Sequence, residues 1–273
     1  MSLLPLGPRA KYSLTIICTL GFAALTLAQS GLSQTVSPVA RDPQAVNVLN
    51  QVLSAAGGTT AIAAIEDFTE TGNITLNWGA PVQGAVTVKG LGFHEFRLDA
   101  TLADGVHSWI TSNSASFQVN PDGSTVRLPS QNLVKPACLT VPILRILLAI
   151  QDTSTNISYG GLVTHDGQQL HDVQIEKIFP QSVDATGVLS NVTKADIYID
   201  PNTLLIQSIS DGAYRRDGGP GQFPHEVRFS NYQATSGVLV PLSVTEFIAD
   251  QQTQTIQLTQ VTFNTGLTDS NFN

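Results

Sequence analysis

The 273-residue chain lacks most of the features that mark easily recognised protein classes. It contains only two cysteines and 12% charged residues, with 13 Lys or Arg against 21 Asp or Glu. Two cysteines cannot build a disulfide scaffold. The formal net charge of −8 argues against a nucleic-acid partner, because such proteins gather Lys and Arg into a basic patch that displaces counterions from phosphates. With 42% hydrophobic residues, the chain can bury a core, so long disorder is excluded.

Motifs for nucleotide, metal and nucleophile chemistry are also missing. The pair Gly90 and Gly92 has no third glycine, and no G-x-x-x-x-G-K-[ST] sequence occurs, so nucleotide phosphates have no cradle. His94 and His225 are each followed by glutamate but lack a second histidine four residues on, which a zinc-binding helix requires. A G-x-S-x-G elbow is absent too. We therefore predict no catalytic residue, no metal and no cofactor, and we expect that the protein is not an enzyme.

One pair of dipeptides leaves an alternative open. His165-Asp166 and His171-Asp172 flank a single turn, which could bring two imidazoles and two carboxylates together for a metal or for acid–base chemistry. Asp166-Gly167 is itself a turn signal, so a polar hairpin tip explains the same residues. We favour the hairpin tip and keep a secreted hydrolase with an unrecognised site as an alternative.

The first 28 residues have the pattern of a secretory signal peptide. Arg9 and Lys11 precede an apolar stretch at residues 14–28, and small residues at its end favour cleavage before Gln29. About 15 apolar residues are fewer than the roughly 20 that span a bilayer. We expect residues 1–28 to be removed, which leaves an exported periplasmic or extracellular protein without a stable membrane span. An uncleaved signal anchor is the alternative.

Two segments of the mature chain have the pattern of helices. After a flexible segment at residues 29–41, Asp42 and Pro43 form an N-cap and a first helical position, and apolar residues then recur at helical spacing until Gly57. Residues 139–150 are nearly all apolar, with a single charge at Arg145, and Thr140 is placed to cap them. This second helix should be buried, because a surface helix needs only one apolar stripe.

The rest of the chain alternates with a period of two, which is typical of strands. A bulge near Thr259 is expected, because apolar residues change parity within the last strand. So many strands with few helices predict a mainly β fold, a large curved antiparallel sheet forming one domain over residues 42–273. The predicted strands are residues 74–78, 82–88, 93–98, 106–110, 117–119, 157–164, 170–179, 195–199, 204–210, 226–232, 242–249 and 253–263.

Short motifs at both ends of the mature chain resemble one known family. The sequence is similar to the LolA-like superfamily of periplasmic lipoprotein carriers, and the likeness spans most of the mature chain. It implies a sheet curled into a half-barrel, with helices over an apolar concave face that holds acyl chains. The motifs are residues 48–58 (VLNQVLSAAGG), 65–68 (IEDF), 72–74 (GNI), 197–200 (IYID), 240–242 (VPL) and 261–264 (VTFN).

These patterns lead to a functional hypothesis. We expect an exported carrier or sensor that binds an apolar ligand, either a lipid or the acyl chain of a lipidated protein, on the concave face of the half-barrel. A structural or protein-interaction module with a filled core is the alternative, and a cavity beside the helix at residues 139–150 distinguishes the two. The sequence makes no prediction of oligomeric state. The candidate apolar lining consists of Trp78, Phe96, Trp109, Leu139, Ile143 and Leu147.

Overall fold

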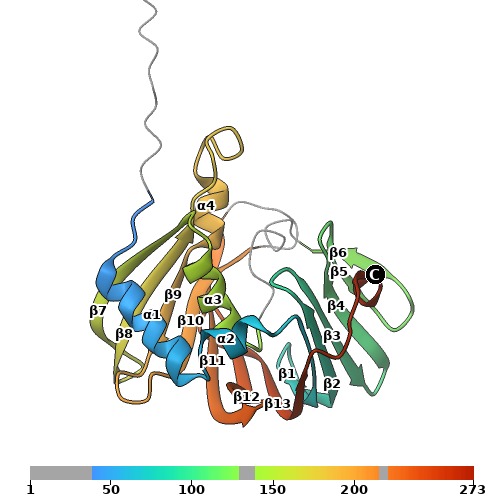
Figure 1. The fold of residues 1–273 in the computed structure, drawn as a ribbon. Helices are drawn as coiled ribbons and strands as arrows, with labels where there is room; N and C mark the ends of the chain where they lie inside the picture. The colour runs from blue at the N-terminus through green and yellow to red at the C-terminus, as the bar shows by residue number, and fades with distance from the viewer. Residues whose placement is uncertain (1–38, 129–138, 215–220) are drawn as a thin grey trace, which may run out of the picture. The chain divides into compact units, whose positions relative to one another are not determined.

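A single antiparallel sheet makes up most of the described chain (Figure 1). The structure is a computed structural model that describes residues 39–128, 139–214 and 221–273. The predicted signal peptide, residues 1–28, and residues 29–38 of the segment expected to be flexible lie outside the described residues. The thirteen strands of the described part are β1 (Asp67–Leu76), β2 (Val82–Leu91), β3 (Glu95–Leu102), β4 (Gly105–Thr111), β5 (Ser116–Val119), β6 (Thr125–Arg127), β7 (Thr155–His165), β8 (Gln168–Lys177), β9 (Ala195–Ile199), β10 (Ile206–Tyr214), β11 (Gln222–Thr235), β12 (Val238–Ile248) and β13 (Gln251–Phe263).

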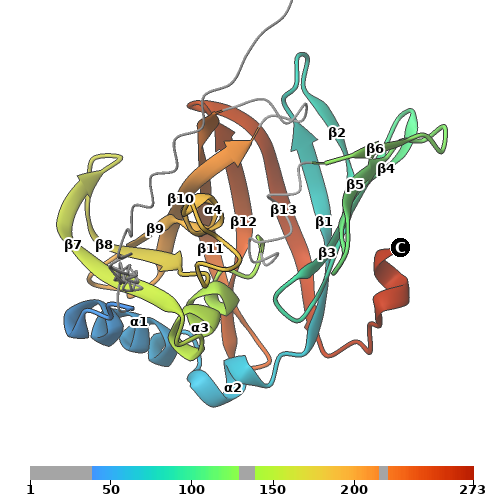
Figure 2. The same ribbon diagram turned by 90° about the horizontal axis from the view of Figure 1, so that it is seen from above.

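The strand order divides the sheet into two meanders. Strands β1 to β6 follow one another in space, as do β7 to β13, and the two meanders meet where β1 pairs with β13. The sheet curves around the helix α3 (Ile143–Gln151), as the view from above shows (Figure 2). The predicted mainly β, half-barrel architecture is confirmed. The three-residue strand β6 is an addition that the sequence pattern did not predict.

The β1–β13 seam contains the expected bulge. Thr71 pairs with Gln260 and Gly72 pairs with Leu258, so Thr259 has no partner residue on β1. The extra residue shifts the parity of β13 and keeps Leu258 and Val261 both in the core. The Thr259 hydroxyl donates to the Thr71 carbonyl at 3.1 Å.

Helix α1 (Pro43–Ala55) forms for the reasons that the sequence indicates. The Asp42 carboxylate accepts from the backbone amides of Gln44 at 2.7 Å and Ala45 at 3.2 Å, which satisfies two free amides of the first turn. Its apolar face is buried against the sheet and includes Leu49 and Leu53. A short helix, α2 (Thr59–Ala63), follows it.

Helix α3 is buried on nearly all sides, as predicted, but it begins differently. Pro142 occupies the N-cap position without a side-chain cap, so the expected capping role of Thr140 is wrong. Thr140 is instead fully buried within the fold. At the other end, the Arg41 guanidinium donates to the carbonyls of Ala149, Ile150 and Asp152, at 2.9–3.3 Å. This charge complements the negative end of the helix dipole.

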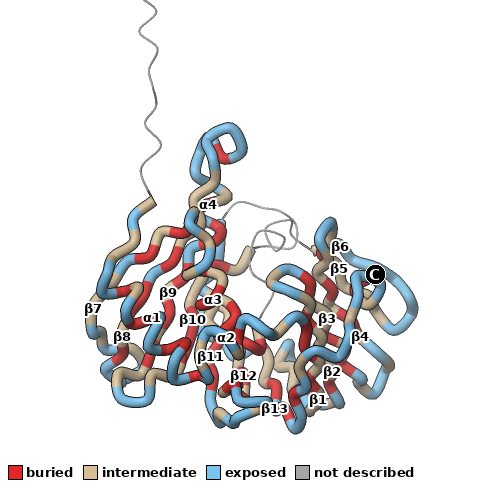
Figure 3. The backbone as a smooth tube through the Cα atoms, in the orientation of Figure 1, coloured by how far each residue is buried: buried red, intermediate tan, exposed pale blue. Residues whose placement is uncertain are grey.

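The core lies between the concave face of the sheet and the helices. Buried positions alternate with more exposed ones along many strands and continue into α1 and α3 (Figure 3). Two shorter elements, α4 (Val188–Thr193) and the 3-10 helix η2 (Asp269–Phe272), lie outside this arrangement of α1 to α3. No helix in the described ranges is long and apolar enough to cross a membrane.

Candidate functional site

A cavity of about 560 Å³ opens on the concave face, between the two meanders. Residues from β1, β3 and β4 form one wall, and residues from β10 to β13 form the other. Aliphatic and aromatic side chains dominate both walls. They include Leu76, Leu98, Ile209, Phe223, Val227 and Phe229. A volume of this size falls within the range of about 300–1,000 Å³ that small-molecule sites usually have.

Four of the six side chains singled out from the sequence lie around this cavity. Trp78, Phe96, Trp109 and Leu139 all line it. Trp78 is 67% exposed and lies in the loop after β1, so it stands at the rim. Because the chain has two tryptophans, both of its indoles are at this cavity.

The other two candidates, Ile143 and Leu147, belong to the packed core. They are 3% and 2% exposed on α3, and they do not contribute to the wall of the cavity. A helix that is apolar on nearly all sides buries most of its surface against the sheet and the other helices, so only part of it is available to a cavity. Arg145 and Leu139 are the residues of the predicted segment 139–150 that reach the wall.

A chain of charged side chains runs along the floor of the cavity. The Arg145 guanidinium contacts one oxygen of Asp211 at 3.4 and 3.5 Å, and the other oxygen of Asp211 lies 2.6 Å from Nδ1 of His225. The second ring nitrogen of His225 lies 3.0 Å from Oε1 of Glu246, and the Thr253 hydroxyl donates to Oε2 of Glu246 at 2.7 Å. We call these five residues the polar chain.

His225 carries a positive charge in the polar chain at neutral pH. Burial lowers the pKa of its imidazole, but the carboxylates of Asp211 and Glu246 outweigh this effect and raise the pKa to about 9. The protonated ring donates to both carboxylates, which is the arrangement that stabilises buried carboxylates best. Two cations and two anions therefore balance within the polar chain.

Strand register explains why the sequence pattern alone does not reveal the polar chain. Asp211 is opposite His225 across β10 and β11, and Glu246 is opposite Val227 across β11 and β12. Each of the three lies at a strand position on the concave side, where the other residues of the same strand face are mostly apolar. A polar residue at a strand position whose neighbours on the same face are apolar can be recognised from the sequence. Only the strand register shows that these three residues are neighbours.

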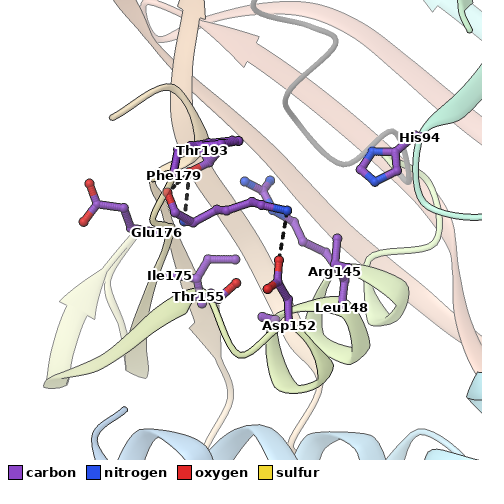
Figure 4. Close-up of a pocket in the computed structure, with 11 residues that line it drawn as sticks. His94, Arg145, Leu148, Asp152, Thr155, Ile175, Glu176, Phe179 and Thr193 are labelled. Carbon is purple, nitrogen blue, oxygen red and sulfur yellow. Dashed lines mark hydrogen bonds and ion pairs between the residues drawn. The ribbon is translucent and has the colours of Figure 1, made fainter. Parts of the chain in front are cut away.

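A second, smaller cavity of about 240 Å³ adjoins α3 on the side of β8 (Figure 4). Arg145 lines this cavity as well as the large one. Lys177 approaches Asp152 at 3.0 Å, and its backbone amide donates to the Thr193 hydroxyl at 2.9 Å. Burial lowers the pKa of His94, and the positive charge of Lys177 lowers it further, so His94 is neutral.

Glu70 is an unusual feature of the core near α3. Its side chain is fully buried on β1, and neither carboxyl oxygen has a hydrogen-bond partner among the described residues. Burial raises the pKa of Glu70 to about 8, with a smaller opposite effect from the Thr140 hydroxyl. At neutral pH this group is therefore mainly a neutral carboxylic acid.

The structure separates the two histidines of the polar hairpin tip. His165 stacks on the Tyr198 ring and contacts Glu226 at 2.9 Å. His171 has the strand parity of the core residue Val173, and its Nδ1 lies 2.7 Å from the Tyr159 hydroxyl. The two imidazoles thus lie on opposite faces of the sheet.

Three ligand-type atoms do gather around His165. His165, Asp166 and Glu226 bring their donor atoms within 4.8 Å of one another. The guanidinium of Arg228 already contacts both carboxylates, with Asp166 at 2.7 Å and Glu226 at 3.2 Å. A cation thus already balances these two acids, and a metal ion would have to displace the arginine.

Comparison with known proteins identifies the fold. No family model and no curated protein sequence matches the chain. Three solved structures match it with a TM-score of 0.50. They are a protein domain described as outer membrane lipoprotein-sorting from Vibrio parahaemolyticus (12% identity, covering 84% of this chain and 96% of that one), a DUF1329 family protein from Desulfovibrio piger (11%, 84% and 97%) and a LolA superfamily protein from Nitrosomonas europaea (13%, 82% and 96%). The chain therefore has a divergent LolA-like fold, as its short motifs indicate.

Proposed function

We propose that the protein is an exported carrier or sensor that binds an acyl chain in the cavity of the concave face. The observation that carries the proposal is the cavity itself, whose wall is mostly apolar while the core beside it is closely packed. Apolar wall area that a ligand removes from water contributes about 25 cal/mol per Å². An acyl chain is long, flexible and apolar, and it suits a wall built of leucine, phenylalanine and tryptophan.

The LolA-like fold supports this proposal. One matching structure is described as a lipoprotein-sorting domain, and another belongs to the LolA superfamily. On this basis the partner is a lipid or a lipidated protein, and the location is the periplasm or the extracellular space. A structural module would have a filled core, whereas the concave face here retains about 560 Å³.

Native mass spectrometry of the mature protein is the experiment that tests the proposal. Purified protein should carry additional mass from co-purified lipid, and organic extraction should remove it. The delipidated protein should then take up a fluorescent fatty-acid analogue with saturation. A wild-type protein that carries no lipid and takes up no acyl probe would rule out the carrier function.

A pair of matched substitutions locates the binding to the cavity. Ala213 lies on the wall, so Ala213→Phe should fill part of the space and weaken uptake of the probe about tenfold. Ala85 on β2 is exposed and away from the cavity, and Ala85→Phe should leave uptake unchanged. Equal uptake by the two variants would place the probe elsewhere on the protein.

A further inference from the structure

Arg145 has an unusual position between the two cavities. Its side chain is 11% exposed and lines both of them. The helix that carries it is otherwise apolar, and a charge on such a helix is retained only at a cost in solvation. This position puts the guanidinium where the apolar part of the large cavity ends.

The polar chain leaves one donor of Arg145 without an acceptor. Both oxygens of Asp211 and both oxygens of Glu246 already have donors within the polar chain. The Nε hydrogen of Arg145 is buried and has no partner among the described residues. The group that Arg145 lacks within the described part of the chain is therefore an acceptor and not a donor.

Asp211 holds the Arg145 guanidinium only loosely. Both of its contacts to Asp211 are long, at 3.4 and 3.5 Å, whereas His225 lies 2.6 Å from the same carboxylate. A guanidinium presents its donors as a planar fork, which fits the two oxygens of a carboxylate.

We propose that Arg145 binds the carboxylate of a long-chain fatty acid whose hydrocarbon chain lies in the large cavity. The inference rests on the proposed function, because it assigns the polar end of the same ligand. It also makes that ligand a free fatty acid, in preference to an esterified acyl chain. An ester offers a carbonyl acceptor but no charge to pair with the guanidinium.

The experiment compares three ligands with the same chain length. Palmitate, methyl palmitate and hexadecanol each compete with the fluorescent acyl probe for the delipidated protein. Wild-type protein should bind palmitate at least about tenfold more tightly than hexadecanol. Arg145→Met should remove this preference by weakening palmitate binding about tenfold. Arg127→Met is the matched control, because Arg127 is exposed on β6 and outside both cavities.

The possible outcomes separate this inference from the proposed function. Equal binding of palmitate and hexadecanol by wild-type protein overturns the role of Arg145 and leaves the carrier function standing. If methyl palmitate competes as well as palmitate, the proposal that Arg145 binds a carboxylate is wrong. Absence of competition by all three ligands overturns the carrier function itself. If Arg145→Met does not fold, Arg145→Lys is measured in its place, because lysine keeps the positive charge but lacks the planar fork of donors. An undiminished preference of this variant for palmitate contradicts the proposal.

Discussion

At the scale of single residues, Glu70 and the polar chain show two ways in which this fold accommodates buried charge. In the polar chain, both acids contact the protonated His225 ring, and Asp211 also contacts Arg145. Glu70 has no cation beside it among the described residues, and the effect of the Thr140 hydroxyl on its pKa is smaller than that of burial, so it remains mainly protonated at neutral pH. This difference makes the stability of the protein depend on pH in a predictable direction.

Glu70→Gln should remove a loss of stability that wild-type protein shows on going from acid to neutral pH. The folded protein keeps the Glu70 proton up to about pH 8, whereas an unfolded chain releases it near pH 4.5. The unfolded state therefore binds fewer protons between these values, and the free energy of unfolding falls as pH rises, by up to about 1.4 kcal/mol per pH unit. Urea denaturation at pH 5 and pH 8 measures the effect.

The variant should have nearly the same stability as wild-type protein at pH 5 and exceed it at pH 8. Glu66→Gln is the matched control, because Glu66 is exposed on the same chain segment. It should leave the pH dependence of wild-type protein intact. Identical slopes for Glu70→Gln and wild-type protein would mean that Glu70 ionises in the folded state.

At the scale of elements, helix α3 and the residues just before it serve two roles. Leu147 packs in the core, whereas Leu139, just before the helix, lies on the wall of the cavity. Leu147→Ala should lower the free energy of unfolding by about 2–5 kcal/mol, because it leaves a void in a packed region. The affinity for an acyl probe should remain nearly unchanged.

Leu139→Ala provides the opposite test on the same segment. It should weaken acyl-probe binding with a smaller loss of stability, since a side chain on a cavity wall makes fewer contacts than one in the core. Thermal unfolding and probe titration of both variants check the two predictions. Weaker probe binding by Leu147→Ala than by Leu139→Ala would place the ligand against the core side of α3.

The elements could largely be predicted from the sequence, whereas the site could be predicted only in part. Alternation with a period of two identifies strands and their faces, and a dozen nearly continuous apolar residues identify the buried helix. Trp78, Phe96 and Trp109, which the sequence analysis names as candidate apolar lining, all line the cavity. The polar chain depends on the pairing of β10 to β12, and pairing is set by contacts between distant segments.

At the scale of the whole molecule, the first and last strands join the two meanders in the middle of the sheet. β1 and β13 are neighbours, and the loop after β13 returns to Asp67, whose carboxylate accepts from the amides of Thr265, Gly266 and Leu267 at 2.6–3.2 Å. These contacts hold the segment after β13 against the start of β1.

Export gives a prediction about the mature protein. Residues 1–28 should be removed in the host, because a basic start, a short apolar stretch and small residues at its end direct cleavage before Gln29. Intact-mass measurement of exported protein checks this. A mass that includes residues 1–28 in a membrane fraction would show that the segment is a signal anchor.

The central claim, that an acyl chain occupies the concave cavity, is tested most directly by tryptophan fluorescence. Both tryptophans, Trp78 and Trp109, line the cavity, so a bromine atom on a bound chain should quench the emission of the protein. We predict saturable quenching by brominated palmitate, with each of Trp78→Phe and Trp109→Phe retaining quenching of the remaining indole. Unbrominated palmitate should reverse it. Absence of saturable quenching in wild-type protein would contradict the account.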